Sequence, residues 1–392
     1  MAKQLNQRVD WVKLVRRYKR SGTKGKSRLL DELCDLYKMN RKYLIRRLNQ
    51  RQKKPITRRG PKATYPPEIF CTILKRFWFS CDQMCSKKLK AAIALWLSSY
   101  EKHYGTLNPE IKCKLLKLSA ATIDRILKPV RLKSTRRRLC GTRPGTLLKH
   151  HIPIKTNQWD ETEPGFVEAD TVAHCGNSLA GEFVWSLTLT DIVTTWTENR
   201  AVWNKGSEGV VTQIKDIEVQ LPFTLKGFDC DNGSEFLNWH LVRYFSNKSR
   251  NSNVQFTRSR PYKKNDNAHV EQKNWTHVRQ LFGYDRFDNR VVVDLMNDLY
   301  RNEWSLLQNH FMPSTKCIAK MKINSKYKKK FDQPKTPYER VLNCSSIAND
   351  IKKRLQETHA KLDPFELKKM VEQKLKFIFK YVQLSEKVRH RL

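Results

Sequence analysis

The stretch FVEADTVAHCGNSLAGEFVWSLTLTDIVTTWTENRAVW, residues 166–203, decides the fold because it has the character of three consecutive β-strands. Residues 166–175, 182–193 and 194–203 are rich in β-branched and aromatic residues, which favour strands. The breaks between them, CGNSLAGE and the residues around Asp191, are short. Three adjacent strands with short connections predict an antiparallel meander.

The residues that follow alternate between helical and strand patterns. A helix is predicted over 207–220, a fourth strand over 221–230 and a helix over 237–245. A short fifth strand over 254–260 and a helix over 268–282 complete the series. The order β-β-β-α-β-α-β-α predicts a mixed five-stranded α/β sheet with crossing helices, which we assign to a core domain at 161–300.

Charge divides the chain into three parts. The 77 Lys and Arg exceed the 38 Asp and Glu by 39 charges. Residues 1–160 carry a net charge of +30, residues 161–290 of −2, and residues 291–392 of +11. Two cationic arms around a nearly neutral centre indicate a polyanionic partner, nucleic acid above all, and make a free-standing metabolic enzyme an unlikely class.

Three further classes find little support in the sequence. No run of about 18 apolar residues predicts a membrane span, and the start MAKQLNQRVDWVKLVRRYKR lacks the apolar centre of a secretion signal. The ten cysteines form no CxxC pair, and none stands near an HxxxH motif. For Cys81 and Cys85, four residues apart, ordinary packing is favoured over a metal site.

Residues 1–54 are predicted to form a helix-turn-helix DNA-binding domain of three short helices. Ser27 and Asn40 are expected to be the N-caps of the second and third helices. The third helix should bury Leu44, Ile45 and Leu48. The alternative is a small helical bundle with a solvated basic face. The residues expected to contact DNA are Arg41, Lys42, Arg46 and Arg47.

A second helical domain is predicted over residues 62–130. Its last helix should begin after the N-cap Ser119 and present Thr122 and Arg125 outward, toward DNA. A second helix-turn-helix and simple core packing are both compatible with this pattern. Residues 131–160, which are basic and contain Gly and Pro, are expected to be a linker that follows DNA phosphates.

Residues 301–392 form a basic, partly helical C-terminal region suited to DNA contact and oligomerisation. The cationic stretch 316–342 predicts either a small strand-rich element or an extended segment. Asp363 and Pro364 restart a helix as N-cap and first helical residue. Its apolar stripe, compatible with core packing or a dimer contact, consists of Leu367, Met370, Val371, Leu375 and Ile378.

Three carboxylates of the core domain are candidates for metal-assisted phosphoryl transfer, which needs two or three of them around hard cations. Asp170 lies within or at the end of the first strand, and Asp231 ends the fourth. Glu271 opens the last helix, at the head of an apolar stripe of Trp275, Val278 and Phe282. For Glu271 alone, a favourable acid in a helix first turn is an equal alternative. The competing nearby acids are Glu168, Asp229 and Glu235.

The runs FVEADTVAHCG, CDNGSEF and SRPYKKNDNAHVEQKN resemble the integrase-core DDE transposases of bacterial insertion sequences. They are more distantly similar to retroviral integrases. Sixty residues separate Asp170 from Asp231, and 39 separate Asp231 from Glu271; the second spacing is close to the family's usual one. The resemblance implies an RNase H-like catalytic core, flanked by all-α helix-turn-helix domains and a basic C-terminal region.

The resemblance also implies a site and partners. Asp170, Asp231 and Glu271 would be the catalytic triad that binds two Mg²⁺ ions, with Mn²⁺ as a substitute. The implied partners are the terminal inverted repeats of a mobile element, target DNA and further copies of the chain in a synaptic complex, without a nucleotide cofactor. The implied location is the bacterial cytoplasm, at the nucleoid. The residues expected near the DNA are Tyr262, Lys263, Lys264, Asn267 and Asn274.

The expected reaction is cleavage of the 3′ strand at the element end by water, followed by attack of the freed 3′-OH on target DNA. Two alternatives remain. One is a nuclease on the same fold that cuts without joining. The other is a helix-turn-helix regulator whose core only binds DNA.

Overall fold

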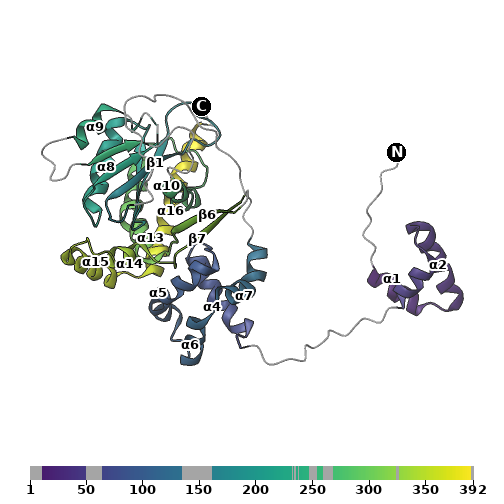
Figure 1. Ribbon diagram of the computed structural model, residues 1–392. Helices are drawn as coiled ribbons and strands as arrows, with labels where there is room; N and C mark the ends of the chain where they lie inside the picture. Colours follow the sequence, from purple (N-terminus) through teal and green to yellow (C-terminus); the bar gives the residue numbers. More distant parts are fainter. Residues whose placement is uncertain are drawn as a thin grey trace. The chain divides into compact units, whose positions relative to one another are not determined.

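The computed structural model describes residues 11–49, 64–134, 161–231, 233, 235–236, 238–246, 254–258, 268–323 and 326–389. The chain divides into two compact units, Met1–Thr64 and Tyr65–Leu392. Figure 1 shows the helical first unit and the mixed α/β second unit.

The N-terminal unit is a three-helix cluster of α1 (Trp11–Arg20), α2 (Thr23–Tyr37) and α3 (Arg41–Leu48). Its core is formed by apolar residues of all three helices, Leu30 and Leu44 among them. Asn40 caps α3 as predicted, because its side chain accepts a hydrogen bond of 2.9 Å from the backbone N–H of Lys42.

Two expectations for this unit are wrong. Ser27 is not an N-cap, because α2 begins at Thr23 and Ser27 lies inside the helix. Ile45 is 37% exposed rather than buried, since three short helices bury only the side of α3 that carries Leu44 and Leu48.

Four helices open the larger unit: α4 (Pro67–Ser80), α5 (Ser86–Tyr104), α6 (Pro109–Lys117) and α7 (Ala120–Lys133). Ser119 caps α7 as predicted, with its Oγ accepting from the backbone N–H of Thr122 at 3.1 Å. The apolar faces of these helices share one core with the C-terminal helices. The indole N–H of Trp96, for example, donates to the carbonyl of Phe311 at 3.0 Å. Residues 65–134 thus pack as part of the larger unit.

The predicted five-stranded mixed α/β sheet is confirmed. Its strands are β1 (Phe166–Ala173), β2 (Val184–Asp191), β3 (Thr197–Trp203), β4 (Gly227–Cys230) and β5 (Gln255–Arg258), in the spatial order β3-β2-β1-β4-β5. The strands β1, β2 and β3 form the expected antiparallel meander, whereas β4 and β5 run parallel to β1.

The helices α8 (Ser207–Gln220) and α9 (Trp239–Phe245) pack with one face of the sheet in a separate apolar core (Figure 1). The strands β1 to β4 are all shorter than their predicted ranges, and the difference is largest for the fourth. The third begins at Thr197 because Thr194 belongs to a turn in which its backbone N–H donates to Asp191 Oδ2 at 2.6 Å. The fourth is limited to Gly227–Cys230.

Two asparagines cover the outer edge of β3. Asn297 of α12 (Val291–Leu299) accepts from the N–H of Ala201 at 2.7 Å and donates to its carbonyl at 3.0 Å. Asn309 of α13 (Ser305–Phe311) makes the same pair of bonds to Thr197, both at 3.0 Å. The side-chain amides replace a neighbouring strand, so this edge cannot pair with another sheet.

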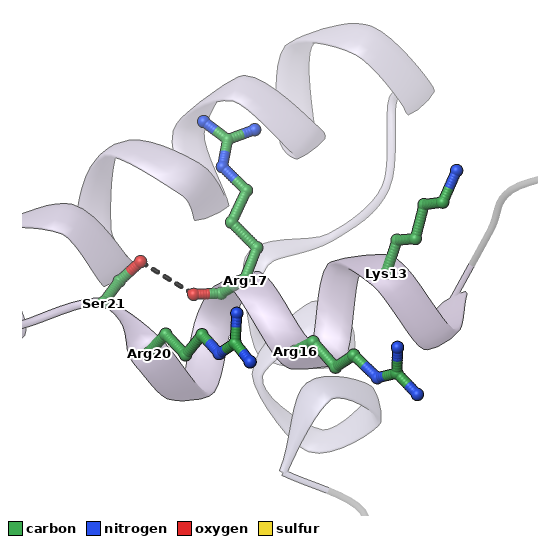
Figure 2. Close-up of a pocket in the computed structure, with 5 residues that line it drawn as sticks. All are labelled: Lys13, Arg16, Arg17, Arg20 and Ser21. Carbon is green, nitrogen blue, oxygen red and sulfur yellow. Dashed lines mark hydrogen bonds between the residues drawn. The ribbon is translucent and has the colours of Figure 1, made fainter.

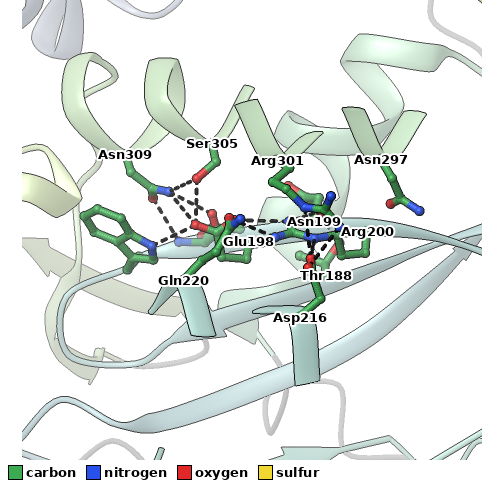
Figure 3. A network of polar contacts seen from close by, with 12 residues as sticks. Thr188, Glu198, Asn199, Arg200, Asp216, Gln220, Asn297, Arg301, Ser305 and Asn309 are labelled. Carbon is green, nitrogen blue, oxygen red and sulfur yellow. Dashed lines mark hydrogen bonds and ion pairs between the residues drawn. The ribbon is translucent and has the colours of Figure 1, made fainter. Parts of the chain in front are cut away.

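A buried polar network ties β3 to the helices beside it (Figure 3). Arg200, which is fully buried, donates to Asp216 at 2.5 Å and to Gln220 at 2.9 Å, both in α8. Glu198 accepts from Ser305 of α13 at 2.6 Å. A buried arginine is tolerated here because each side of its guanidinium meets an acceptor.

The C-terminal region contains the hairpin β6 (Cys317–Ile323) and β7 (Lys326–Phe331), followed by α14 (Pro337–Leu342), α15 (Asn349–Lys361) and α16 (Pro364–Arg389). Asp363 caps α16 as predicted, accepting from the N–H of Phe365 at 2.9 Å. The stripe on α16 is mainly core: Leu367, Val371 and Ile378 are buried. Among the residues that the structure describes, no helix combines the length and apolar character needed to cross a membrane.

Candidate active site and nucleic-acid interface

The first two candidate carboxylates are brought together by neighbouring parallel strands. In the register of β1 and β4, Ala169 lies opposite Cys230. The next residues along the chain are Asp170, which lies in β1, and Asp231, which directly follows β4. Side chains alternate between the two faces of a sheet, and Ala169 and Cys230 belong to the core beneath α8 and α9. Asp170 and Asp231 therefore lie beside each other on the opposite face.

The third carboxylate is carried by a helix that is hydrogen-bonded to β1. This helix, α10 (Ala268–Lys273), begins where Glu168 accepts from the backbone N–H of Val270 at 3.0 Å. One turn later, Asn274 Nδ2 donates to Asp170 Oδ2 at 2.6 Å. The two bonds flank Glu271, whose side chain is exposed, and hold its backbone next to Asp170.

The electrostatics of these acids show that they act on one another. Burial raises the pKa of Asp170 to about 8, and the negative charges of Asp231, Glu235 and Glu271 add to the effect. The pKa of Asp231 is raised by burial and by the negative charge of Glu235. The hydrogen bond from the backbone N–H of Gly233 acts in the opposite direction but does not cancel this rise. Carboxylates in mutual repulsion hold protons that a cation would displace.

The three competing acids each have a structural partner. Glu168 anchors α10, as described, and Asp229 accepts from Thr257 Oγ1 of β5 at 2.6 Å. The negative charge of Glu235 raises the pKa of both aspartates. Glu235 itself forms an ion pair of 2.6 Å with Lys205, and Thr171 Oγ1 donates a hydrogen bond of 2.7 Å to it. These contacts assign Glu168 and Asp229 to holding the sheet and helix together.

The glycine of the DNG turn is explained by the same site. A Cβ at Gly233 would lie 2.5 Å from Glu235 Oε2, closer than any non-bonded contact allows. The backbone N–H of Gly233 in turn donates to Asp231 Oδ1 at 2.9 Å. A larger residue would displace the carboxylate of Glu235.

The residue types fit a hard divalent cation. Asp170, Asp231 and Glu271 offer only carboxylate oxygens, the ligands that Mg²⁺ prefers, and a cation would relieve the repulsion that raises the pKa of Asp170. Within the described ranges, no three His, Cys, Asp or Glu side chains already stand in coordinating positions.

The helix that carries Glu271 departs from the expected apolar stripe. After α10 the chain forms a π-helical segment, η2 (Asn274–Arg279), and then α11 (Gln280–Phe282). The wider turn leaves Trp275 49% exposed, while Val278 and Phe282 are buried as predicted. It also turns the buried Asn274 toward Asp170. The prediction of Trp275 as a buried residue is wrong because it assumed a regular α-helical period.

A basic face of the N-terminal unit was missed by the sequence analysis. Lys13, Arg16, Arg17 and Arg20 of α1 line an open pocket of about 390 Å³ together with Ser21 (Figure 2). Ser21 Oγ donates to the carbonyl of Arg17 at 2.8 Å, which closes the helix end. The signal was present in the spacing of these four residues, which places them on one side of a helix.

The residues expected to contact DNA differ in their surroundings. Arg41 is engaged within the unit, with an ion pair to Asp31 and a hydrogen bond of 2.8 Å to Ser27 Oγ. Lys42, Arg46 and Arg47 are exposed.

In the larger unit, Arg125 is exposed and donates to Thr122 Oγ1 at 3.1 Å. Asn274 is buried and bonded to Asp170. Outside the described residues lie Tyr262, Lys263, Lys264 and Asn267.

Comparisons with known proteins gave one extensive match. No protein-family model matches the chain. It is 36% identical over 331 residues to the "Uncharacterized protein y4rM" of Sinorhizobium fredii, across 83% of this chain and 92% of the rhizobial protein. A structure described as a simian T-cell lymphotropic virus intasome in complex with PP2A regulatory subunit B56 gamma aligns at 14% identity and a TM-score of 0.30, over 54% of this chain and 68% of that one.

Proposed function

The chain belongs to the family of the Sinorhizobium fredii protein y4rM, and we propose that it is a Mg²⁺-dependent DDE transposase with an RNase H-like core. The observation that carries this proposal is the meeting of Asp170, Asp231 and the start of α10 on one face of the sheet. Residues separated by 60 and 39 positions are brought together there, in a chain with a net charge of +39. A cluster of acids inside a strongly cationic protein suits a reaction on a polyanion.

The residues of the chain have distinct parts in this proposal. Asp170, Asp231 and Glu271 would hold two Mg²⁺ ions, which supply Lewis acidity at the reacting phosphate and stabilise the leaving oxygen. Asn274 orients Asp170 through the 2.6 Å bond to Oδ2. The pKa of Asp170 is raised to about 8, so a cation bound there would favour the deprotonated form of its carboxyl group.

The proposed reaction has two in-line displacements. A water oxygen bonds to the phosphorus at the element end while the bond from phosphorus to the 3′ oxygen breaks, and the 3′ oxygen leaves with a proton. The oxygen of that 3′-OH then bonds to a phosphorus of the target, the bond from this phosphorus to a target 3′ oxygen breaks, and one proton is lost from the attacking hydroxyl and one gained by the displaced 3′ oxygen. Neither step needs a covalent enzyme intermediate or a nucleotide cofactor.

The cationic arms support the proposed DNA partner. Residues 1–160 carry a net charge of +30 and residues 291–392 of +11, enough to neutralise phosphates of an element end and of target DNA. The exposed basic residues of α1 and α3 suit the N-terminal unit to the recognition of a duplex. Synapsis of two element ends would require at least two copies of the chain.

One assay tests the proposal. Purified protein is incubated with Mg²⁺, a target plasmid and labelled DNA from the ends of the element that encodes it, with Asp231→Asn as the inactive control. Joined products are expected. Cut ends without joining would identify a nuclease, and binding without cutting would identify a DNA-binding regulator; either result would refute the proposed transposase.

A further inference from the structure

A cationic cavity lies on the side of α10 and η2 that faces away from the carboxylates. Its volume is about 290 Å³, and its walls come from the α4–α5 connection, α5, α10 with η2, and the residues after α13. Lys88 of α5, Lys273 of α10 and His277 of η2 line it.

The two lysines of the cavity have no anionic partner among the described residues. Lys273 is only 7% exposed, and no hydrogen bond or ion pair joins it or Lys88 to a described carboxylate. Asp82, the one acidic residue in the described lining, is paired through Oδ1 with Lys368 at 2.5 Å. The nearby Arg340 is likewise paired, with Asp332 at 2.7 Å.

Burial of the Lys273 ammonium group in a cavity that the half-buried Lys88 also lines is costly unless an anion joins them. Lysine is a common ligand of phosphate, which it binds as a point charge with three donors. The cavity also holds an acceptor, because Asp82 Oδ2 is buried without a hydrogen-bond partner in the described structure. A hydroxyl group or water beside a bound phosphate would satisfy that oxygen.

The cavity is linked to the carboxylate site through one short helix. Asn274 points from this segment to Asp170, whereas Lys273, the residue before it, faces the cavity. Glu271 lies only two residues away from Lys273. An anion held by Lys273 would therefore fix the position of the helix that presents Glu271.

We propose that Lys88 and Lys273 form a phosphate subsite that binds a backbone phosphodiester of the DNA on which the carboxylate site acts. This subsite rests on the proposed function for the identity of its ligand, since a free phosphate compound has the same chemistry. Binding of DNA at the subsite couples substrate engagement to the placement of α10.

The first experiment measures equilibrium binding of a 30-base-pair duplex as a function of salt, in EDTA so that no cutting occurs. Lys273→Gln and Lys88→Gln are each expected to lower the slope of log K against log salt by about one, and to weaken binding several-fold at low salt. The matched control is Lys90→Gln, at an exposed position of α5. This variant should lower the salt slope and the affinity for the duplex less than Lys273→Gln and Lys88→Gln do. Unchanged slopes for Lys273→Gln and Lys88→Gln would overturn the proposal.

The second experiment separates the two sources of phosphate. Thermal unfolding is followed with inorganic phosphate, tripolyphosphate or duplex DNA at matched ionic strength. Stabilisation by the duplex that is lost in the Lys88→Gln, Lys273→Gln double variant supports a phosphodiester. Stabilisation by tripolyphosphate alone, with normal DNA binding by the double variant, would show a free-phosphate site and refute the proposal.

Two controls keep the outcome interpretable. Without anions, Lys273→Met is expected to unfold at a temperature equal to or higher than that of the wild type, because it removes a buried charge. Lys273→Arg keeps the positive charge and should show the wild-type slope of log K against log salt. The measurements need no catalysis. A protein that fails to cut DNA but shows these slope changes would refute the proposed transposase and leave the subsite in place.

Discussion

The basic surface of the N-terminal unit and the carboxylate site of the sheet are assembled in opposite ways. The cations of α1 are four residues within one helix, exposed by the helical period alone. The acids come from two strands and a helix separated by 60 and 39 residues, and strand register and two side-chain hydrogen bonds bring them together. The first surface depends on local structure, whereas the second exists only in the folded larger unit.

The largest expected effect is the loss of chemistry on removal of one carboxylate. Asp170→Asn, Asp231→Asn and Glu271→Gln should each lower cleavage and joining by about a thousandfold or more, because one site serves both steps. DNA binding should persist, since the arms carry most of the positive charge. Cleavage, strand transfer and binding in Mg²⁺ are measured for each variant.

The controls are the three structurally engaged acids. Glu168→Gln keeps an acceptor for the N–H of Val270, and Asp229→Asn keeps one for Thr257, so both should remain active. Glu235→Gln should also remain active. If Glu235→Gln is inactive while Glu271→Gln cuts normally, the third ligand is misassigned. Full activity in all six variants would contradict the carboxylate mechanism itself.

The second effect concerns the separation of the two units. Removal of residues 1–64 should lower the affinity for the specific element end by about a hundredfold or more, to the level of weak non-specific DNA binding. The remaining chain should fold, because residues 65–392 form one compact unit. Footprinting and thermal unfolding check both parts of this prediction.

A longer truncation tests the same boundary. Removal of residues 1–130 deletes α4, α5 and α6 with most of α7 and exposes the core that Trp96 shares with Phe311. Insoluble or unfolded protein is expected. A stable, monomeric product of this truncation would contradict the joint packing of these helices with the C-terminal region.

The third effect is a difference in acid sensitivity between the units. Burial lowers the pKa of His174 to about 3, with a contribution from Arg279, and burial with His359 lowers that of His310 to about 3. Both pKa values lie below the usual 6.5, so below pH 6.5 the unfolded chain binds protons that the folded unit does not. The folded unit therefore has its full stability above pH 6.5 and loses stability as the pH falls toward 3. Between pH 7 and 5.5 each should cost the larger unit about 1 kcal/mol.

The N-terminal unit provides the contrast, because residues 1–64 contain no histidine. Its unfolding should change little over the same pH range. Urea unfolding of the chain at pH 7 and pH 5.5, followed by hydrogen exchange, distinguishes the units. Equal loss of stability in both would show that groups other than the buried histidines dominate.

The smallest effects are expected for single arginines of the N-terminal unit. Arg16→Ala and Arg20→Ala should weaken DNA binding several-fold and lower the salt slope by about one each, without a change in stability. Arg41→Ala removes an ion pair and a hydrogen bond, so it should destabilise the unit by about 1 kcal/mol or less. Salt titrations and thermal unfolding of the three variants are compared. A larger binding loss for Arg41→Ala than for Arg16→Ala would show that Arg41 contacts DNA in spite of its bonds to Asp31 and Ser27.

The sequence by itself determined the elements of this protein and the order in which they follow. Alternation and helical periodicity depend on neighbours in the chain, so the antiparallel meander, the helix at Ser207–Gln220 and the caps Asn40, Ser119 and Asp363 were predictable. The three candidate carboxylates can also be named from the sequence, because each lies at a strand end or helix start where a side chain can face a site.

The tertiary structure decided which polar groups are buried and what they bind. A hydrogen bond from Arg41 to Ser27 joins α3 to α2, and Asn297 bonds to the backbone at the outer edge of β3. Asn274 turns to Asp170 through a π-helical segment, while Lys273 enters a cavity shared with α5. These outcomes depend on contacts between residues far apart in the chain, and no local pattern encodes them, because the cost of burying a polar group is set by whichever distant partner the fold brings to it.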